Sequence, residues 1–412
     1  MESLSDKLKS LGVKTGARDL PRPKARKFGF PIEEVMAGFD DHTPLGATWI
    51  VQQDYGRDYQ HGSVQLSTEC QVGFLADWCG CEGLNNHALH DYIFLDTETS
   101  GLAGGTGTYA FMIGLGFRTQ SGFRLMQMFM RDPSQEPALL ASLSRVLSPF
   151  KVVVTFNGRG FDIPLLKTRH VMNGIPQPFD DLQHIDLLPV ARKLWRNRLP
   201  SRALKSLEID ILGVPRSADD VPGYLIPEMY FEYLRSGDAR PLSGIFYHNG
   251  MDILSLAALF IFVNDLLAAP LQLQSIDSLD LLAIARAHED QGFIDQAIGL
   301  YERAIAQGLP RPFFTDTLHR FAQLNRRQGS WERALHLWMK SANEYQHIEA
   351  CVELAKFYEH RQRNYEEALS WTQAALQFLS TSDRIPAKKI MLQKELERRI
   401  ARLVKKIAQS PL

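Results

Sequence analysis

Short apolar runs alternate with segments of helical spacing in the middle of the chain. Four runs have the length and apolar character of strands: 92–95, 108–117, 123–130 and 151–156. Two other segments, 136–147 and 246–267, repeat apolar residues at the intervals of a helix. We therefore expect a folded middle region in which strands and helices are interspersed.

The last third of the chain changes to a longer repeat. A leading alanine, a second position four residues later and a small residue three positions after that recur from Ala297, Ala334 and Ala368. The leading alanines are 37 and 34 residues apart, close to the 34-residue tetratricopeptide period. We predict three stacked helix pairs, capped by a basic helix over about 387–408. Their concave face would bind a partner protein, or the stack would brace the preceding domain; both interpretations stay open.

Length and composition set the number of domains. With 412 residues and 45% hydrophobic residues, the chain can form two or three domains with cores of their own. Residues 1–45 combine basic residues with prolines and few large apolar residues, which predicts a basic, mobile arm. Residues 46–90 predict a small β-rich lead-in element. We expect the main domain over 91–268 and the helical repeats over 275–408.

The net charge, the apolar runs and the cysteines indicate which binding partners and which cellular compartment to expect. The formal net charge is −1, so any nucleic-acid surface would be local. No apolar run approaches the ~20 residues of a membrane span, and the N-terminus lacks the apolar core of a signal peptide. These features predict a soluble, cytoplasmic protein without membrane contact. The four cysteines, among them Cys79 and Cys81, match no paired zinc motif and favour free thiols over a zinc site.

Two acids follow the first apolar run. Side chains alternate along a strand, so Asp96 and Glu98 point to the same face. Two ionised carboxylates at the end of a buried strand repel each other and resist desolvation unless a cation lies between them. The pair therefore predicts a site for Mg²⁺ or Mn²⁺. The glycine-rich stretch 101–107 lacks the Gly-Lys-Ser/Thr ending of a P-loop and is expected to pass close to this site or to a substrate.

Three further residues lie where they can join these acids. Asp162 falls in the first turn of a helix that opens after a strand and the tight turn 157–161. His248 and Asp252 are four residues apart and share one helix face, whereas Tyr247 is rotated off that face. A histidine that titrates near neutrality beside a metal-binding acid can serve as a general base for activating water.

A basic segment follows Asp162 in the chain. Residues 191–205 hold six basic residues and no acid, with Trp195 among them. This composition fits a groove that follows a phosphate backbone and stacks a base. A solvated helix face with a buried Trp195 fits it equally well. In the groove interpretation, the nucleic-acid-binding residues are Asn157, Phe161, Arg192, Lys193, Trp195, Arg196, Arg198 and Arg202.

The order of these acids resembles the DEDD exonuclease superfamily, which has the ribonuclease-H-like fold. The motifs are Asp-x-Glu, Asn-x-x-x-Phe-Asp ending at Asp162, and His-x-x-x-Asp ending at Asp252. Residues 91–265 are most similar to the YprB-type ribonuclease-H-like domain, through the runs 94–107, 155–158, 185–188 and 248–249. The resemblance implies an α/β fold with a mixed central sheet flanked by helices, followed here by an all-α tetratricopeptide-like helical solenoid.

The same resemblance implies a two-metal mechanism. Asp96 would bridge two Mg²⁺ or Mn²⁺ ions, Glu98 and Asp252 would hold the ion that carries the nucleophilic water, and Asp162 would support the second ion. Two such ions about 3.5 to 4 Å apart stabilise the entering and leaving oxygens of an in-line displacement. His248 would orient or deprotonate the water.

One spacing departs from the superfamily pattern. Its members place histidine five residues before the last aspartate or tyrosine four residues before it, whereas here His248 has the tyrosine spacing and Tyr247 the histidine spacing. The shared helix face favours His248. Asp186 is an extra acid that lies near the site or serves the following turn; the sequence leaves both open.

The leading hypothesis is a 3′-to-5′ exonuclease that hydrolyses phosphodiester bonds of single-stranded or partly unwound DNA or RNA. One alternative is a non-catalytic adaptor that binds nucleic acid and recruits a partner, such as a helicase, through its repeats. Another is a structure-selective endonuclease with the same metal site. A pure binding domain has no need of four mutually repelling carboxylates, which favours an enzyme.

Overall fold

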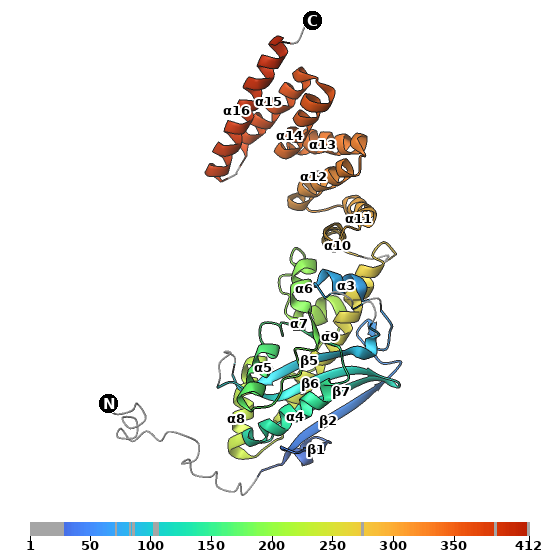
Figure 1. Cartoon of the computed structure of the whole chain (residues 1–412), viewed down its shortest axis with the longest axis vertical. Helices are drawn as coiled ribbons and strands as arrows, with labels where there is room; N and C mark the ends of the chain where they lie inside the picture. Colours follow the sequence, from blue (N-terminus) through green and yellow to red (C-terminus); the bar gives the residue numbers. More distant parts are fainter. Residues whose placement is uncertain are drawn as a thin grey trace, which may run out of the picture.

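The computed structural model describes residues 29–70, 72–81, 84, 87–101, 107–272, 276–382 and 385–409. A domain with a central sheet forms one end of the elongated molecule, and a column of helices forms the other (Figure 1). The first 28 residues of the predicted basic arm lie outside the described residues, as does 102–106 of the glycine-rich stretch.

A seven-stranded mixed sheet forms the centre of the first domain, in the order β1-β2-β7-β6-β5-β8-β9. The pairing is antiparallel from β1 to β5 and parallel from β5 through β8 to β9. The strands are β1 (Phe39–Thr43), β2 (Gly46–Gly56), β5 (Tyr92–Thr99), β6 (Ala110–Thr119), β7 (Gly122–Phe129), β8 (Val152–Thr155) and β9 (Gln183–Asp186). The four predicted strands are confirmed as β5, β6, β7 and β8.

The N-terminal part of the sheet differs from the prediction of a separate lead-in element. β2 pairs with β7 from Trp49↔Phe129 to Gly56↔Gly122, and β1 pairs with β2. Trp49 and Ile50 are buried in the core of this domain. β1 falls within 1–45, which the sequence predicted to be a mobile arm, and β2 falls within the predicted lead-in element 46–90. Both strands instead belong to the main sheet, because apolar side chains such as Trp49 and Ile50 need its core to be covered. The short strands β3 (Gln60–His61) and β4 (Val64–Gln65) form their own two-stranded sheet.

Helices cover both faces of the sheet, and the alternation of side chains along β5 shows the two layers. Phe94 belongs to a core with α6 (Leu187–Trp195) and most of α9 (Leu242–Ala268). Ile93 and Leu95 belong to a second core on the opposite face. That core contains α4 (Glu136–Leu147), α5 (Asp162–Met172), α8 (Ile226–Ser236) and the first turns of α9. The fold is the predicted mixed sheet flanked by helices, of the ribonuclease-H-like kind.

The long helix α9 bears on the expectation that no apolar run approaches the length of a membrane span. It is the one helix among the described residues that is long and apolar enough to cross a membrane, judged by length and composition alone. In the structure, 72% of its most apolar window is buried inside the protein. It therefore packs as the central helix of the domain, where its apolar residues meet β5, β6 and β7.

The C-terminal region consists of helices throughout its described part. They are α10 (Ser278–Asp290), α11 (Ile294–Gln307), α12 (Arg311–Arg327), α13 (Trp331–Tyr345), α14 (Ile348–Phe357), α15 (Tyr365–Thr381) and α16 (Pro386–Gln409). The repeated positions Ala297, Ala334 and Ala368 are fully buried. Gly292 and Gly329, with φ of 81° and 82°, end the first helix of the first two pairs. The predicted helix pairs and the last basic helix are thus present.

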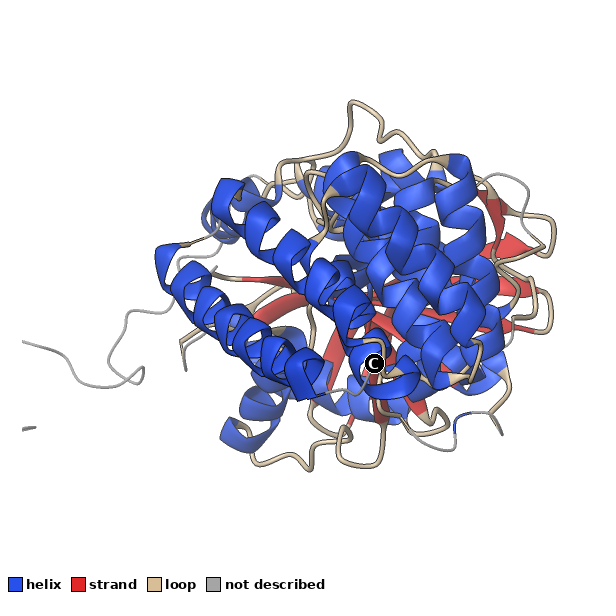
Figure 2. Cartoon of the chain, turned by 90° about the horizontal axis from the view of Figure 1, so that it is seen from above, coloured by secondary structure: helices blue, strands red, loops and turns tan. Residues whose placement is uncertain are grey.

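The helical region packs directly on the sheet domain. One continuous core runs from Phe94 and α9 into α10 and α11. Figure 2, seen from above, shows the helices lying over the end of the domain that contains the sheet. At this junction, Arg198 Nε donates to Asp280 Oδ1 over 2.8 Å. These contacts favour the interpretation of the first helix pair as a brace.

Candidate active site

Asp96 and Glu98 occupy the second half of β5, and both are partly exposed while Thr97 and Thr99 between and after them are buried. This alternation places the two acids on one face of the sheet, as predicted. The pairing of β5 with β6 is irregular between Glu98 and Thr99. The acids therefore lie where the central strand leaves its regular ladder.

A chain of amides sets the direction of Asp96. Asn249 Nδ2 of α9 donates to Asp96 Oδ2 over 3.1 Å, and Gln127 Nε2 donates to Asn249 Oδ1 over 3.0 Å. Gly114 lies opposite Asp96 in β6, and a Cβ there would come 2.3 Å from Asn249 Oδ1. A glycine inside a strand is a sequence signal for such a close approach, although it does not name the approaching residue.

Asp162 begins α5, as the sequence predicted, and is bound to the strand of the first motif. Thr97 Oγ1 donates to Asp162 Oδ1 over 2.5 Å. Burial raises the pKa of Asp162 to about 6, although the hydrogen bond from Thr97 acts in the opposite direction. Asp162 is thus a buried acid held next to β5.

Asp252 and His248 share one face of α9, as the sequence predicted. His248 Nε2 lies 3.6 Å from Asp252 Oδ2. The other oxygen, Asp252 Oδ1, accepts a hydrogen bond from Arg216 Nη2. Tyr247 lies off this face, and its hydroxyl accepts a hydrogen bond from Ser217 N over 3.0 Å. Of the two residues left open by the motif spacing, His248 is the one beside Asp252.

The four acids influence one another electrostatically. Burial, followed by the charges of Asp252, Asp162 and Glu98, raises the pKa of Asp96 well above its ordinary value. Burial and the charges of Asp252 and Asp162 do the same for Glu98, and burial raises the pKa of Asp252. The hydrogen bonds from Thr97 to Asp162 and from Asn249 to Asp96 link β5 to α5 and α9, so the carboxylates of all three motifs lie in one region.

A cluster of carboxylates with raised pKa values is a donor set that suits divalent cations. Within the described residues, no three His, Cys, Asp or Glu side chains meet in a preformed metal-binding group. Asp252 directs one oxygen to Arg216, and Asp162 accepts from Thr97. The donor chemistry therefore fits a metal, and the side chains would adjust around it.

A buried ion network, which the sequence did not indicate, surrounds Asp252. Arg216 binds Glu208 through two hydrogen bonds of 2.6 and 2.5 Å, and its Nη1 lies 3.1 Å from Asp220 Oδ1. The Arg216 side chain is 4% exposed and that of Glu208 is 0% exposed. These three residues lie in or beside an irregular segment, so no periodic pattern or motif spacing could have identified them.

Asp186 takes the structural role that the sequence had left open. Its carboxylate accepts from Asn157 N, Arg159 N and Leu188 N over 2.8, 3.1 and 3.0 Å. It therefore caps α6 and fixes the turn of the second motif, in which Asn157 adopts a left-handed φ of 69°. Its charge also contributes to the raised pKa of Asp162.

The basic segment contains both packing residues and surface residues. Trp195 is fully buried, so it cannot stack on a base in this structure. Arg198 is paired with Asp280, and Arg202 Nη1 donates to the carbonyls of Leu199 and Pro200. These three are removed from the predicted nucleic-acid-binding set because their side chains serve the fold. Exposed residues that keep that prediction are Asn157, Arg192, Lys193 and Arg196, and Phe161 is half-buried.

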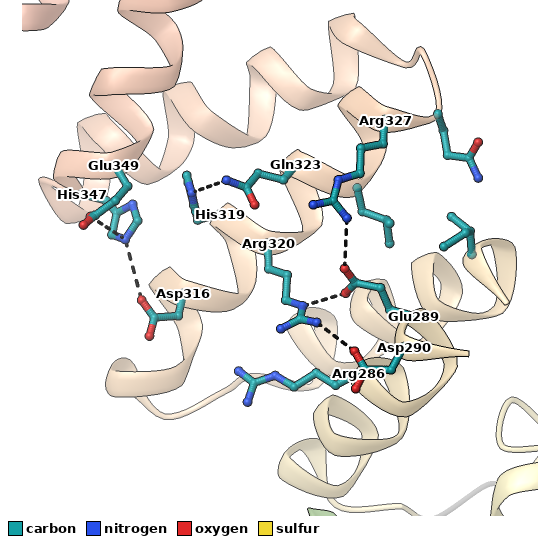
Figure 3. Close-up of a pocket in the computed structure, with 13 residues that line it drawn as sticks. Arg286, Glu289, Asp290, Asp316, His319, Arg320, Gln323, Arg327, His347 and Glu349 are labelled. Atoms are coloured by element: carbon teal, nitrogen blue, oxygen red, sulfur yellow. Dashed lines mark hydrogen bonds and ion pairs between the residues drawn. The ribbon is translucent and has the colours of Figure 1, made fainter. Parts of the chain in front are cut away.

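A cavity of about 890 Å³ lies in the helical region, apart from the acids (Figure 3). Its walls come from α10, the start of α11, α12 and the start of α14. Arg320 Nε donates to Glu289 over 2.6 Å, and His347 Nε2 lies 3.8 Å from Asp316 Oδ1. Opposite charges across this cavity largely neutralise each other, so it is a polar surface without one dominant charge.

Comparison with known proteins defines the class first. Residues 93–264 match the family model described as the RNase_H superfamily. These residues span β5 to α9 and contain every acid of the candidate site.

The particular family follows from a relative that this chain matches over most of its length. The chain is 32% identical over 372 residues to the Bacillus subtilis (strain 168) protein described as "Uncharacterized protein YprB", covering 87% of this chain and 86% of the relative. The chain belongs to the YprB family. Among solved structures, the family B DNA polymerase of Pyrobaculum calidifontis matches with a TM-score of 0.32 and 17% identity, over 51% of this chain and 28% of the polymerase.

Proposed function

We propose that this protein is a divalent-metal-dependent nuclease, and specifically a 3′-to-5′ exonuclease acting on single-stranded or partly unwound nucleic acid. One observation carries the proposal: Thr97 of β5 binds Asp162 at the start of α5, and Asp96 of β5 is bound by Asn249 of α9, so the acids of the three motifs lie around the end of β5. Keeping four carboxylates together destabilises a fold unless a cation uses them. A nuclease accounts for this destabilising cluster of carboxylates, because its substrate and its chemistry both need bound cations.

In this reaction, the residues of the site would bind the metal ions, orient a metal ligand and accept a proton. Asp96, Glu98, Asp162 and Asp252 would hold two Mg²⁺ or Mn²⁺ ions, which supply charge stabilisation to the entering and leaving oxygens of phosphodiester hydrolysis. Asn249 keeps Asp96 oriented. His248 lies beside Asp252 and would accept a proton from the attacking water.

The substrate would contact the protein through local basic residues, since the chain as a whole is nearly neutral. Arg192, Lys193 and Arg196 are exposed along and just after α6. Such residues bind phosphates without reading base sequence. We therefore expect little sequence preference.

The first test is cleavage of 5′-labelled single-stranded DNA and RNA in Mg²⁺ or Mn²⁺. We expect a ladder that shortens from the 3′ end, lost in EDTA and reduced by at least about 10³-fold in Asp96→Asn, because that change removes a charged metal ligand. Asp181→Asn is the matched control, since Asp181 is an exposed acid outside the cluster. Retained cleavage in Asp96→Asn would contradict the proposed site.

Circular single-stranded DNA separates the proposal from the endonuclease alternative. A circle has no 3′ end, so an exonuclease leaves it intact, whereas an endonuclease makes it linear. Binding of both polymers without cleavage would favour the adaptor. A protein partner for the helical region also stays a proposal, and the polar cavity of Figure 3 is the surface at which to test it.

A further inference from the structure

The segment 213–222 lies along the first turns of α9 and is tied to it at several points. Ser217 N donates to Tyr247 Oη over 3.0 Å. At Gly244, a Cβ would come 2.6 Å from Val221 Cγ1 and 3.2 Å from Asp219 O. Gly244 precedes His248 by one helical turn, so its missing side chain lets the segment approach the face that carries the histidine.

This approach brings Asp220 against His248. Asp220 Oδ1 lies 2.7 Å from His248 Nδ1, and the side chain of Asp220 is 4% exposed. Its second oxygen accepts from Lys205 Nζ, also over 2.7 Å. Burial alone would raise the pKa of Asp220, but the hydrogen bonds from Lys205 and His248 outweigh it and hold that pKa below its ordinary value. Donors of Lys205, Arg216 and His248 surround the carboxylate of Asp220, which therefore acts as their acceptor.

The contact decides which nitrogen of His248 carries the proton. A carboxylate at hydrogen-bonding distance can only accept, so Nδ1 must donate. Arg216 Nη1 lies 3.1 Å from both His248 Nδ1 and Asp220 Oδ1. Since Arg216 and Nδ1–H are both donors, they share the oxygen of Asp220 and do not bond to each other. In the neutral ring, the lone pair is then on Nε2, which faces Asp252 Oδ2.

We propose that Asp220 is a positioning residue for His248, which holds the proton on Nδ1 and presents the Nε2 lone pair to the carboxylate cluster. The catalytic meaning of this contact rests on the proposed nuclease function. In that reaction, a lone pair of the water oxygen would form the new P–O bond, while one O–H bond breaks with its electrons returning to that oxygen and its proton passing to Nε2. The P–O bond to the leaving group would break with its electrons on the leaving oxygen. Asp220 would stabilise the imidazolium through Nδ1–H.

Arg216 and Glu208 fix the orientation of Asp252, the other polar residue of the third motif. Arg216 is fixed by its two hydrogen bonds to the fully buried Glu208, and it donates to Asp252 Oδ1. The oxygen that remains, Oδ2, is the one that faces His248. The segment 213–222 thus orients both polar side chains of the third motif.

The kinetic test compares Asp220→Ala with Asp219→Ala, an exposed neighbour in the same segment. We expect Asp220→Ala to lower kcat by about 10²-fold, the usual contribution of a general base, with KM within about threefold of wild type. Asp219→Ala should leave kcat within about twofold of wild type. Asp220→Glu should restore part of the loss, because it again supplies an acceptor for Nδ1–H. An unchanged kcat in Asp220→Ala would overturn the proposal.

A spectroscopic test does not depend on activity. In protein labelled with ¹⁵N-histidine, His248→Gln assigns the signals of His248 among the 12 histidines. At a pH where the ring is neutral, we expect the Nδ1–H form in wild type and a mixture of forms in Asp220→Ala. Asp220→Asn, which keeps the side-chain shape, should shift the signals in the same direction if the alanine variant does not fold. Identical signals in wild type and a folded Asp220 variant would refute the contact.

The two tests separate this proposal from the nuclease function. A wild-type protein that cleaves neither DNA nor RNA, yet shows the shift in Asp220→Ala, would reject the proposed function and support the positioning contact. An active wild type, together with an Asp220→Ala variant that shows neither the shift nor a loss of kcat, would support the proposed function and reject the positioning contact.

Discussion

Two acids of the candidate site, Asp96 and Asp162, depend on uncharged neighbours for their direction. Asn249 donates to Asp96, and Thr97 donates to Asp162. Asn249 can reach Asp96 because Gly114 has no side chain. A carboxylate whose hydrogen bond is already made has less freedom to lose when it takes a ligand. Changes at these neighbours should therefore lower activity while every acid is still present.

Gly114→Ala tests this dependence. Its Cβ would come 2.3 Å from Asn249 Oδ1 and would push that amide away from Asp96. We expect a loss of about 1–3 kcal/mol in the free energy of unfolding from overpacking, and a fall in cleavage rate of roughly tenfold or more. Denaturant unfolding and single-turnover cleavage measure the two effects. Gly56→Ala is the control, because no atom lies within 4 Å of a Cβ at that position.

At the level of elements, the last helix is held by a buried charge. Glu359 lies in the turn Tyr358–Gln362, and its side chain is 0% exposed. It accepts hydrogen bonds of 2.9 Å from Arg399, Arg402 and Lys406 of α16. Burial alone would raise the pKa of Glu359, but the bonds from Arg402 and Lys406 lower it to about 2. The basic face of α16 is thus partly an internal contact.

The lowered pKa predicts a pH-dependent stability. Glu359 takes up a proton more readily in the unfolded chain, so its contribution is complete above pH 4.5 and is lost as the pH falls toward 2. We expect Glu359→Gln to reduce the free energy of unfolding by about 3 kcal/mol at pH 7 and by progressively less below pH 4.5. Urea unfolding at several pH values measures the difference. Glu395→Gln, at an exposed position of α16, should show no such trend.

For the whole molecule, the junction between the two regions combines an apolar core with one ion pair. α10 and α11 share a core with α9, and Arg198 binds Asp280 beside it. Burial raises the pKa of Asp280, although Arg198 acts against this. We expect this pair to fix how the helical region sits on the sheet domain more than it adds stability.

Arg198→Ala should lower stability, whereas Arg196→Ala should weaken nucleic-acid binding. Loss of Arg198 leaves the buried Asp280 without its partner, so we expect a reduction of about 1–3 kcal/mol in the free energy of unfolding and faster hydrogen exchange in α10. Arg196 is exposed, so its loss should leave stability unchanged and weaken nucleic-acid binding with a shallower salt dependence. A stability loss in Arg196→Ala would contradict this division of roles.

The sequence by itself determined the features that repeat or that carry a motif. Alternation along 92–99 placed Asp96 and Glu98 on one face, and the interval of four residues placed His248 beside Asp252. The spacing of buried alanines gave the helix pairs of the C-terminal region. These patterns are local, so the backbone geometry of one element is enough to interpret them.

The tertiary structure decided what depends on residues far apart in the chain. The side chains of Glu208, Arg216 and Asp220 follow no periodic pattern, and they meet His248 and Asp252 only because the segment 213–222 packs on α9. The long-range pairing of β2 with β7 likewise assigned the N-terminal strands to the main sheet. In both cases, the partner is chosen by burial and charge in three dimensions, which spacing along the chain does not encode.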